Sequence, residues 1–505
     1  MDDVEINGLQ TRARWCEVGL LVVAAVIAAG SARDYAGGWN DGSRLATVES
    51  LVDRHTLAID DSIFVRSAET ADAPNPYTPG DELLRLKGTQ DKLFIGGHYY
   101  SDKSPLPAFW LAAWYQVLKW LTGLSVREHP RLFCYSMTLV SSGMAYIAGV
   151  WSVWRLALRK QLPLHACLLL AASLATATVA LPYTRHVNNH VLLLAAVALL
   201  LLVLDRLTVR YRRVGFAHHD VPGHDVHDVQ RSARERLFPI LAVMTAGALA
   251  GLGYSFDLGL GPVLLLSTAG LVAYRTRSVL AMFFFSLGAF PWLAAHHAVN
   301  YYTGATLGPA NSVPEYLAWP GSPFSAQNMT GGWAHGGLGH FLLYAAALLF
   351  GKHGFVNYNL PVLLALVSLA PLFRRRIAEL PEIAFAAALS GGSWLLYAAL
   401  SNNYSGPCCS IRWFVPLLAP AYYLLILALR ERPALMRDLA LLSLYGAMLS
   451  AYLWFRGPWD GRVPVMLWPI NAVALISWLL IKAKSRSVQS GFEVGQPQPR
   501  RNKAA

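Results

Sequence analysis

Long apolar runs that carry almost no charge limit what this chain can fold into more than any other feature. A run of about 20 residues, rising about 1.5 Å per residue as a helix, crosses roughly 30 Å of hydrocarbon. Only 14% of the 505 residues are charged, whereas about a quarter are charged in a typical soluble domain. With a further span over 132–154, the runs predict an all-α polytopic membrane protein of about 12 transmembrane helices. They lie at 17–32, 163–182, 191–204, 237–253, 258–273, 279–294, 360–373, 383–401, 413–429, 439–455 and 463–481.

The positive charges predict how these helices are oriented. The net charge is +12, but the lysines and arginines cluster in short loops beside the apolar runs, which is typical of cytoplasmic loops and not of a nucleic-acid surface. If residues 105–122 crossed the membrane, all later clusters would lie outside. If they do not cross, the clusters all lie inside. These clusters are 155–160, 206–213, 275–277, 374–376, 430–432 and 482–486.

This topology divides the chain into a cytoplasmic N-terminus (1–16), a multi-span membrane domain (17–482) and a disordered cytoplasmic tail (483–505). Within the membrane domain, two long outer loops are predicted at 34–131 and 295–358. The expected location is the inner (plasma) membrane, with the polar outer loops facing the outside or the periplasm.

The stretch GGHYYSDKSPLPAFW at 96–110 is a polar turn that leads directly into an aromatic helix. Phe109, Trp110 and Trp114 share one side of that helix, and Lys119 lies on another side, which is typical of a helix in the outer membrane interface. Asp102 and Lys103 are then expected where the aqueous loop meets the lipid headgroups. That location suits the binding of a lipid phosphate.

Asp41 and Arg44 open a second helical pattern soon after the first span. An aspartate at a helix start can cap free N–H groups, so a structural role and a catalytic role both stay open on spacing alone. The pattern predicts an amphipathic helix, with its apolar and acidic residues on separate sides. The apolar side holds Leu45, Val48, Leu51 and Val52, and the acidic side holds Glu49 and Asp53.

The motif order in this loop resembles the GT-C class of membrane glycosyltransferases. Asp41-x-x-Arg44, then Tyr99 and Tyr100, then Lys103-x-Pro105-Leu106 is similar to the first outer loop of bacterial aminoarabinose transferases and protein O-mannosyltransferases. The resemblance covers roughly the first 130 residues. The chain departs from that pattern at Gly42, where the family has an acidic residue, and at Ser104, where it has a proline.

The resemblance implies a GT-C-like fold and sugar transfer from a polyprenyl-phosphate donor to a hydroxyl-bearing acceptor on the outer face. Asp41 matches the catalytic aspartate, which would take the hydroxyl proton, and Lys103 matches the lysine that contacts the carrier phosphate. Further phosphate contacts are expected from Arg44, Arg185 and Arg412, since arginine grips phosphate with two donors. The expected substrate-binding residues are His98, Tyr99, Tyr100, Asp102, His190 and Tyr404.

Other acidic residues have two interpretations. Asp257, at an outer turn, is either an ordinary helix cap or a site residue. Asp60, Asp61 and Asp91 are either acceptor or metal contacts or solvated loop carboxylates. A divalent metal is left open, and no other cofactor is expected. The HHDVPGHDVHD segment of the 206–236 loop has metal-ligating residue types in a pattern typical of a solvated loop.

The acceptor is an envelope glycan, a lipid or a protein; the other expected partners are membrane lipids, and no nucleic acid is expected. The alternative function is a transporter or flippase of a lipid-linked envelope precursor. A transporter would carry broken helices and polar groups at the membrane midplane. Here the candidate residues gather near the outer ends of the spans, which favours an enzyme with an interfacial site.

Overall fold

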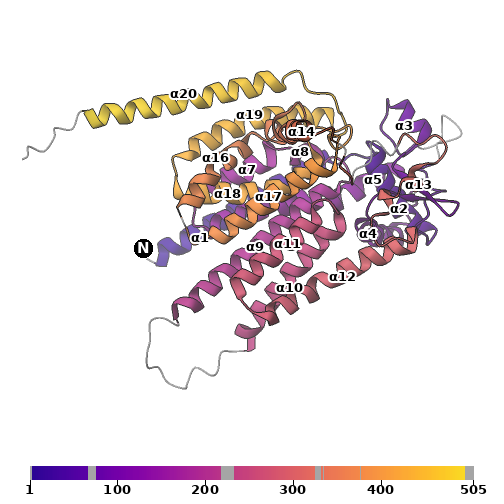
Figure 1. Ribbon diagram of the computed structural model, residues 1–505, viewed down its shortest axis with the longest axis horizontal. Helices are drawn as coiled ribbons and strands as arrows, with labels where there is room; N and C mark the ends of the chain where they lie inside the picture. Colours follow the sequence, from indigo (N-terminus) through magenta and orange to yellow (C-terminus); the bar gives the residue numbers. More distant parts are fainter. Residues whose placement is uncertain are drawn as a thin grey trace, which may run out of the picture.

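A bundle of long helices and a compact assembly of loops at one end make up the computed structural model (Figure 1). The structure describes residues 3–494, apart from 66–74, 218–232, 325–330, 334 and 376. Across this described part, secondary structure is almost wholly helical, as the apolar runs predict. The polytopic all-α membrane class is confirmed.

Nine described helices are long and apolar enough to cross a membrane, or ten if one bent pair counts as a span. The predicted spans at 163–182, 258–273 and 360–373 correspond to shorter helices, so the count of twelve stays a prediction. The nine are α1 (Asp3–Ser31), α5–η1–α6 (Pro130–Thr138, Leu139–Gly143, Met144–Arg159), α9 (Asn189–Ala217), α10 (Ala233–Phe256), α12 (Val279–Gly304), α17 (Leu380–Leu400), η5–α18 (Arg412–Leu417, Leu418–Glu431), α19 (Leu435–Arg456) and α20 (Leu467–Val494). The shorter helices are α7 (Leu164–Thr176), with α8 (Ala180–Tyr183) after it, α11 (Gly261–Thr276) and α16 (Leu360–Arg374).

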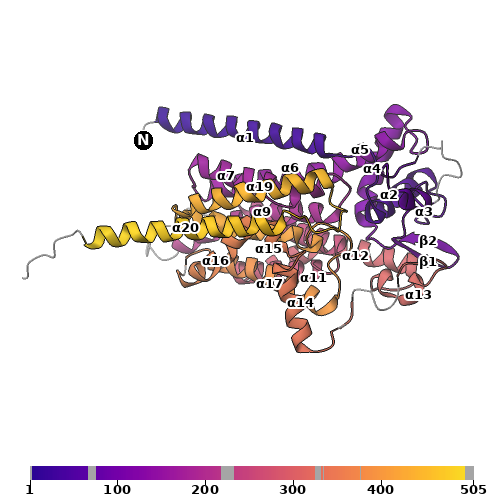
Figure 2. The same ribbon diagram turned by 90° about the horizontal axis from the view of Figure 1, so that it is seen from above.

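Two segments of the chain form the compact assembly, which we call the loop end (Figure 2). Its elements are α2 (Trp39–Asp53), α3 (Glu82–Lys87), β1 (Lys92–Ile95), β2 (His98–Ser101), α4 (Leu106–Thr122), η3 (Ala310–Ser312) and α13 (Pro314–Leu317). β1 and β2 form an antiparallel hairpin that pairs Phe94 with Tyr99. Its two turn residues, Gly96 and Gly97, have φ of 58° and 90°, which glycine adopts without steric cost.

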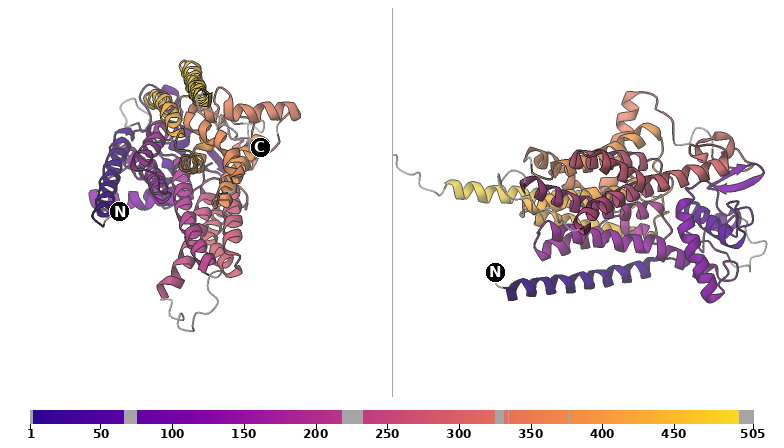
Figure 3. Two further views of the ribbon diagram at one scale, coloured as in Figure 1. Left: turned by 90° about the vertical axis from the view of Figure 1, so that its left-hand side faces the viewer. Right: turned by 90° about the horizontal axis from the view of Figure 1, so that it is seen from below.

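α4 lies beside the bundle end and does not run along the bundle (Figure 3). The predicted interfacial helix over 105–122 is therefore present. In chain order it lies between two long helices of the bundle, α1 and α5–α6. The small residues Ala108 and Ala112 of α4 are buried, whereas its Trp110 and Trp120 are 58% and 76% exposed. An exposed tryptophan face suits the headgroup region of a membrane.

α2 is buried on nearly all sides, so its predicted amphipathic pattern is wrong. Glu49 should have faced solvent, but its side chain is fully buried and accepts hydrogen bonds from Arg54 Nη2 (2.8 Å), Ser62 Oγ (2.6 Å) and the Ile63 N–H (3.1 Å). The loop that follows α2 folds back over the acidic side. Hydrogen bonds replace water around the carboxylate, because a buried charge is costly unless it is paired.

The opposite end of the bundle carries the described N-terminus and the end of α9 (Figure 1). Buried ion pairs tie the helices together there: Lys160 Nζ lies 2.6 Å from Asp205 Oδ1 and 3.2 Å from Glu379 Oε1. Arg430 binds both oxygens of Glu379, at 2.8 and 3.0 Å. Lys160 and Arg430 belong to two of the basic clusters that predict the cytoplasmic side.

Two segments depart from the bundle axis or from the predicted boundaries. α14 (Leu338–Phe350) and α15 (Phe355–Tyr358) meet α16 at a bend of 112°, and α14 projects sideways from the bundle (Figure 2). α20 continues to Val494, so a helix extends into the first half of the predicted disordered tail. Residues 495–505 lie outside the described part.

Candidate functional site

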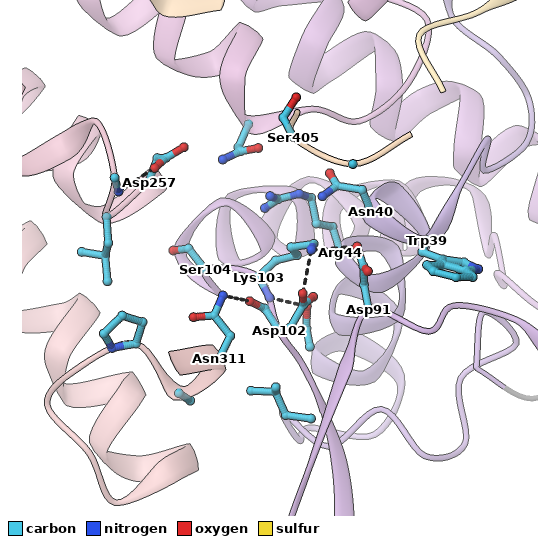
Figure 4. Close-up of a pocket in the computed structure, with 18 of the residues that line it drawn as sticks. Trp39, Asn40, Arg44, Asp91, Asp102, Lys103, Ser104, Asp257, Asn311 and Ser405 are labelled. Carbon is cyan, nitrogen blue, oxygen red and sulfur yellow. Dashed lines mark hydrogen bonds and ion pairs between the residues drawn. The ribbon is translucent and has the colours of Figure 1, made fainter. Parts of the chain in front are cut away.

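A cavity of about 1140 Å³ opens where the loop end meets the helix ends of the bundle. Figure 4 shows its polar wall, where α2 and the β2–α4 connection face the turn between α10 and α11. The residues that line it come from regions up to about 400 positions apart in the chain. They belong to 37–57, 81–105, 189–190, 256–262, 296–331, 396–413 and residue 459.

Arg44 is the most unusual charge in this cavity. It lies on the second turn of α2 and is only 4% exposed, and its Nε and Nη1 atoms have no hydrogen-bond partner. Burial lowers the pKa of Arg44 to about 10, while the Asp102 carboxylate opposes that shift. The guanidinium therefore stays charged at neutral pH. Buried donors without a partner cost free energy, so this pocket is suited to an anion.

Arg412 approaches the same space from the start of η5. Its guanidinium carbon lies 5.7 Å from the centre of the Trp459 ring, and its Nε atom has no hydrogen-bond partner. The positive charges of Arg44 and Arg412 act on each other. A dianionic group between the two side chains would offset this repulsion.

Lys103 is not a free cation. Its Nζ atom lies 2.7 Å from Asp91 Oδ2 and 2.7 Å from Asp102 Oδ2, so one positive charge is held by two negative ones. Burial raises the pKa of Asp102, and the Lys103 ammonium opposes that change. Asp102 Oδ1 is buried without a partner, and Asn311 Nδ2 donates to the Asp102 carbonyl at 3.0 Å. This triad joins the two ends of the β1–β2 hairpin, since Asp91 precedes β1 and Asp102 and Lys103 follow β2.

Asp41 does not line the cavity. Its Oδ2 accepts a hydrogen bond from the Gly37 N–H (2.7 Å) and lies 3.3 Å from His186 Nδ1. The His186 ring packs against Trp459 at 6.4 Å, and a Cβ atom on Gly37 would lie 2.5 Å from that imidazole. Gly37 lies before the first residue of α2, so Asp41 holds the segment that leads into the helix. The capping role and the catalytic role of Asp41 both stay predictions.

We expect Asp41→Asn to leave the protein folded and turning over. The asparagine oxygen still accepts the Gly37 N–H, so the expected loss of stability is about 1 kcal/mol or less. Thermal unfolding and transfer rates of the purified variant check this. A fall in rate of about 10²–10⁴ without unfolding would instead identify Asp41 as a general base.

The remaining predicted site residues divide between the cavity and its surroundings. Tyr100 and His190 line the cavity with Asp102 and Lys103. Tyr99 packs edge-on against Trp319 at 5.8 Å. His98 faces outward, and its Nδ1 lies 3.2 Å from Asp60 Oδ2. Tyr404 and Arg185 pack on the bundle. The Tyr404 ring packs on Tyr344, and Arg185 donates to the Trp454 and Phe455 carbonyls at the end of α19.

Several cavity residues were not singled out by the sequence. Asn40, Asn189, Asn300 and Asn311 all line the cavity. Their side chains carry no charge, and Asn300 and Asn311 belong to α12 and η3, far from the first-loop motifs. Only Asn189 had a local signal, because it precedes His190 in a polar segment between two apolar runs.

The described residues contain no group of three or more His, Cys, Asp or Glu side chains placed to hold a metal. The HHDVPGHDVHD segment lies within 218–232 and so falls outside the described residues. A divalent metal stays a prediction. Cys408 and Cys409 are adjacent, buried free thiols.

The comparisons with known proteins give structural likenesses only. No family model matches the chain, and no curated protein matches it. The crystal structure of ArnT from Cupriavidus metallidurans bound to undecaprenyl phosphate is similar, with 12% identity, 92% of this chain and 75% of that chain covered, and a TM-score of 0.46. The archaeal oligosaccharyltransferase AglB from Archaeoglobus fulgidus, in complex with an inhibitory peptide and a dolichol-phosphate, has 12% identity and a TM-score of 0.44. The chain spans 56% of AglB's length, and 88% of this chain is covered.

At TM-scores below 0.5 these likenesses concern the overall arrangement of helices and identify no site. ArnT, an aminoarabinose transferase, and AglB are both GT-C glycosyltransferases. That is the class whose first outer loop the motifs at 41–106 resemble.

Proposed function

We propose that this chain is a membrane glycosyltransferase that moves a sugar from a polyprenyl-phosphate donor to a hydroxyl-bearing acceptor. The observation that carries the proposal is a pair of arginines, the buried Arg44 and the half-buried Arg412, whose guanidinium groups have unpartnered donors beside one cavity. Such donors are best satisfied by an oxyanion that can accept several hydrogen bonds at once. A phosphate group has this property.

The position of the cavity favours a lipid-borne phosphate over a soluble one. It lies at the junction of the helix bundle and the loop end, and the exposed tryptophans of α4 lie on the same end of the bundle. Lipid phosphates lie at that depth of a membrane when the long helices span it. The cavity is also lined by apolar and aromatic residues from the loop end, among them Trp39, Leu93 and Phe324.

The chemistry of sugar transfer requires charge stabilisation at the leaving group. As the acceptor oxygen bonds to the anomeric carbon, the bond from that carbon to the phosphate oxygen breaks, and the electron pair stays on the phosphate. Arg44 and Arg412 stabilise the added charge by hydrogen bonds and electrostatic attraction. A carboxylate of the cavity takes the proton that the acceptor hydroxyl loses.

The alternative of a transporter has one feature in its favour, the 112° bend between α14–α15 and α16. However, none of the described residues of these three helices lines the cavity. The polar groups of the site instead come from helix ends and loops. The proposal therefore remains an enzyme whose site lies on the outer face, with an envelope glycan, a lipid or a protein hydroxyl as acceptor.

The test is a transfer assay with purified protein in liposomes. We expect one member of a panel of polyprenyl-phosphate sugars to lose its sugar to a hydroxyl acceptor, and polyprenyl phosphate to compete with that donor. The proposal is wrong if the protein moves labelled carrier lipid across the bilayer and transfers sugar from no donor in the panel.

A further inference from the structure

Four carboxylates line the cavity, those of Asp81, Asp91, Asp102 and Asp257, and they are not equivalent. Asp81 is exposed, and its side chain caps α3 by accepting the Leu84 N–H. Asp91 and Asp102 each direct one oxygen at the Lys103 ammonium, at 2.7 Å. The second oxygen of Asp102 is buried and has no hydrogen-bond partner. An oxygen bound to a cation is a poor proton acceptor, because protonation would break that ion pair. Unlike Asp91 and Asp102, Asp257 forms no ion pair with a lysine or arginine among the described residues.

Asp257 lies in the turn between α10 and α11, across the cavity from Arg44 and Lys103 (Figure 4). Its Oδ1 atom accepts three hydrogen bonds, from Tyr397 OH (2.8 Å), the Gly259 N–H (2.8 Å) and the Leu260 N–H (3.3 Å). These bonds account for the cap interpretation. They also lock the carboxylate in one orientation, since all three donors are on helices or a tight turn.

The other oxygen, Oδ2, lies 3.3 Å from His190 Nδ1 at the start of α9. The distance is that of an ion pair, but the alignment is not that of a hydrogen bond, because His190 Nδ1 has no hydrogen-bond partner. Both side chains line the cavity. The unbonded oxygen and an unpartnered imidazole nitrogen therefore meet at one place on the cavity wall, across from Arg44.

We infer that Asp257 is the proton acceptor for the attacking hydroxyl and that His190 is a positioning residue for its Oδ2 atom. The inference rests on the proposed function. The acceptor oxygen bonds to the anomeric carbon, the bond from that carbon to the phosphate oxygen breaks, and the hydroxyl proton passes to Asp257 Oδ2. The polyprenyl phosphate leaves with the electron pair, beside Arg44 and Arg412. Asp257 then faces Arg44 across the cavity, so the base and the phosphate bound by Arg44 lie on different sides of the anomeric carbon, as displacement at that carbon requires.

The surroundings of Asp257 shift its pKa and so predict a pH dependence of transfer. Burial raises its pKa, and the hydrogen bonds from Tyr397, Gly259 and Leu260 and the charge of Arg44 partly oppose that rise. His190 is the remaining titratable group against it. A base must be deprotonated to act, so transfer should fall as the pH drops through this raised pKa. The fall should be absent from the residual activity of Asp257→Asn.

The test compares Asp257→Asn with wild type in the liposome transfer assay. Asparagine keeps an oxygen for the Gly259 and Leu260 N–H groups, so the turn should hold. We expect kcat to fall by about 10²–10⁴, and binding of polyprenyl phosphate to stay within about threefold, because the arginines are unchanged. Tyr397→Phe, which removes only one donor to Oδ1, should give a smaller fall in kcat.

The outcomes separate this inference from the proposed function. If wild type transfers sugar and Asp257→Asn transfers it at a similar rate with an unchanged pH profile, Asp257 is only a turn-capping residue. If Asp257→Asn unfolds, the kcat of Tyr397→Phe decides between the two roles of Asp257. A reduced kcat in this variant supports Asp257 as the proton acceptor, and a wild-type kcat shows that Asp257 is only structural. Wild type that transfers nothing from any donor contradicts the proposed function itself.

Discussion

Replacing Arg44 by glutamine should remove most sugar transfer and most binding of polyprenyl phosphate. The side chain is buried, and two of its donors have no partner in the protein, so the ligand is expected to supply the acceptors. Removing one preorganised donor from a developing oxyanion typically costs about 10²–10³ in rate. Transfer kinetics and direct binding of polyprenyl phosphate in detergent measure the two effects.

Two further variants show whether charge or geometry is lost. Arg44→Lys keeps the charge but not the planar fork, so it should recover only part of the binding. Arg131→Gln is the matched control, because Arg131 is 82% exposed and pairs with Asp34 at the surface. Arg44→Gln that binds polyprenyl phosphate as tightly as wild type would show that the anion binds elsewhere.

Replacing Lys103 by methionine should destabilise the protein more than it alters donor recognition. The substitution leaves Asp91 and Asp102 facing each other without the ammonium that both contact. Breaking a buried ion pair by removing one partner typically costs about 3–5 kcal/mol. The loss should shrink at low pH, where the two carboxylates become protonated, and thermal unfolding at several pH values measures it.

A triple variant tests the cause. Asp91→Asn and Asp102→Asn, added to Lys103→Met, remove the stranded charges and should restore most of the lost stability. The sequence instead predicts that Lys103 contacts the carrier phosphate. That interpretation is correct if Lys103→Met unfolds at the wild-type temperature and loses only the binding of polyprenyl phosphate.

The membrane class and the helix over 105–122 could be predicted from the sequence because their signals are local. An apolar run, a basic cluster beside it and a row of tryptophans each act over one helix. The same holds for the first-loop group: Arg44, Asp102 and Lys103 belong to one loop, and all three line the cavity. The number of spans was harder, because α7, α11 and α16 have 13, 16 and 15 residues, fewer than the roughly 20 residues that cross a bilayer as a helix.

The direction and pairing of the side chains were decided only by the tertiary structure. Asp41 and Arg44 are three residues apart on α2, yet Arg44 lines the cavity and Asp41 faces His186. Lys103 looked free in the sequence but is held by Asp91, twelve positions earlier, and by Asp102.

Asp257 had no local signal beyond that of a cap, and it meets His190 and Tyr397 only where three helices end together. Spacing along a chain places residues on one element. Whether a charged group meets a ligand, a counter-ion or a helix end depends on packing between elements that the spacing does not encode.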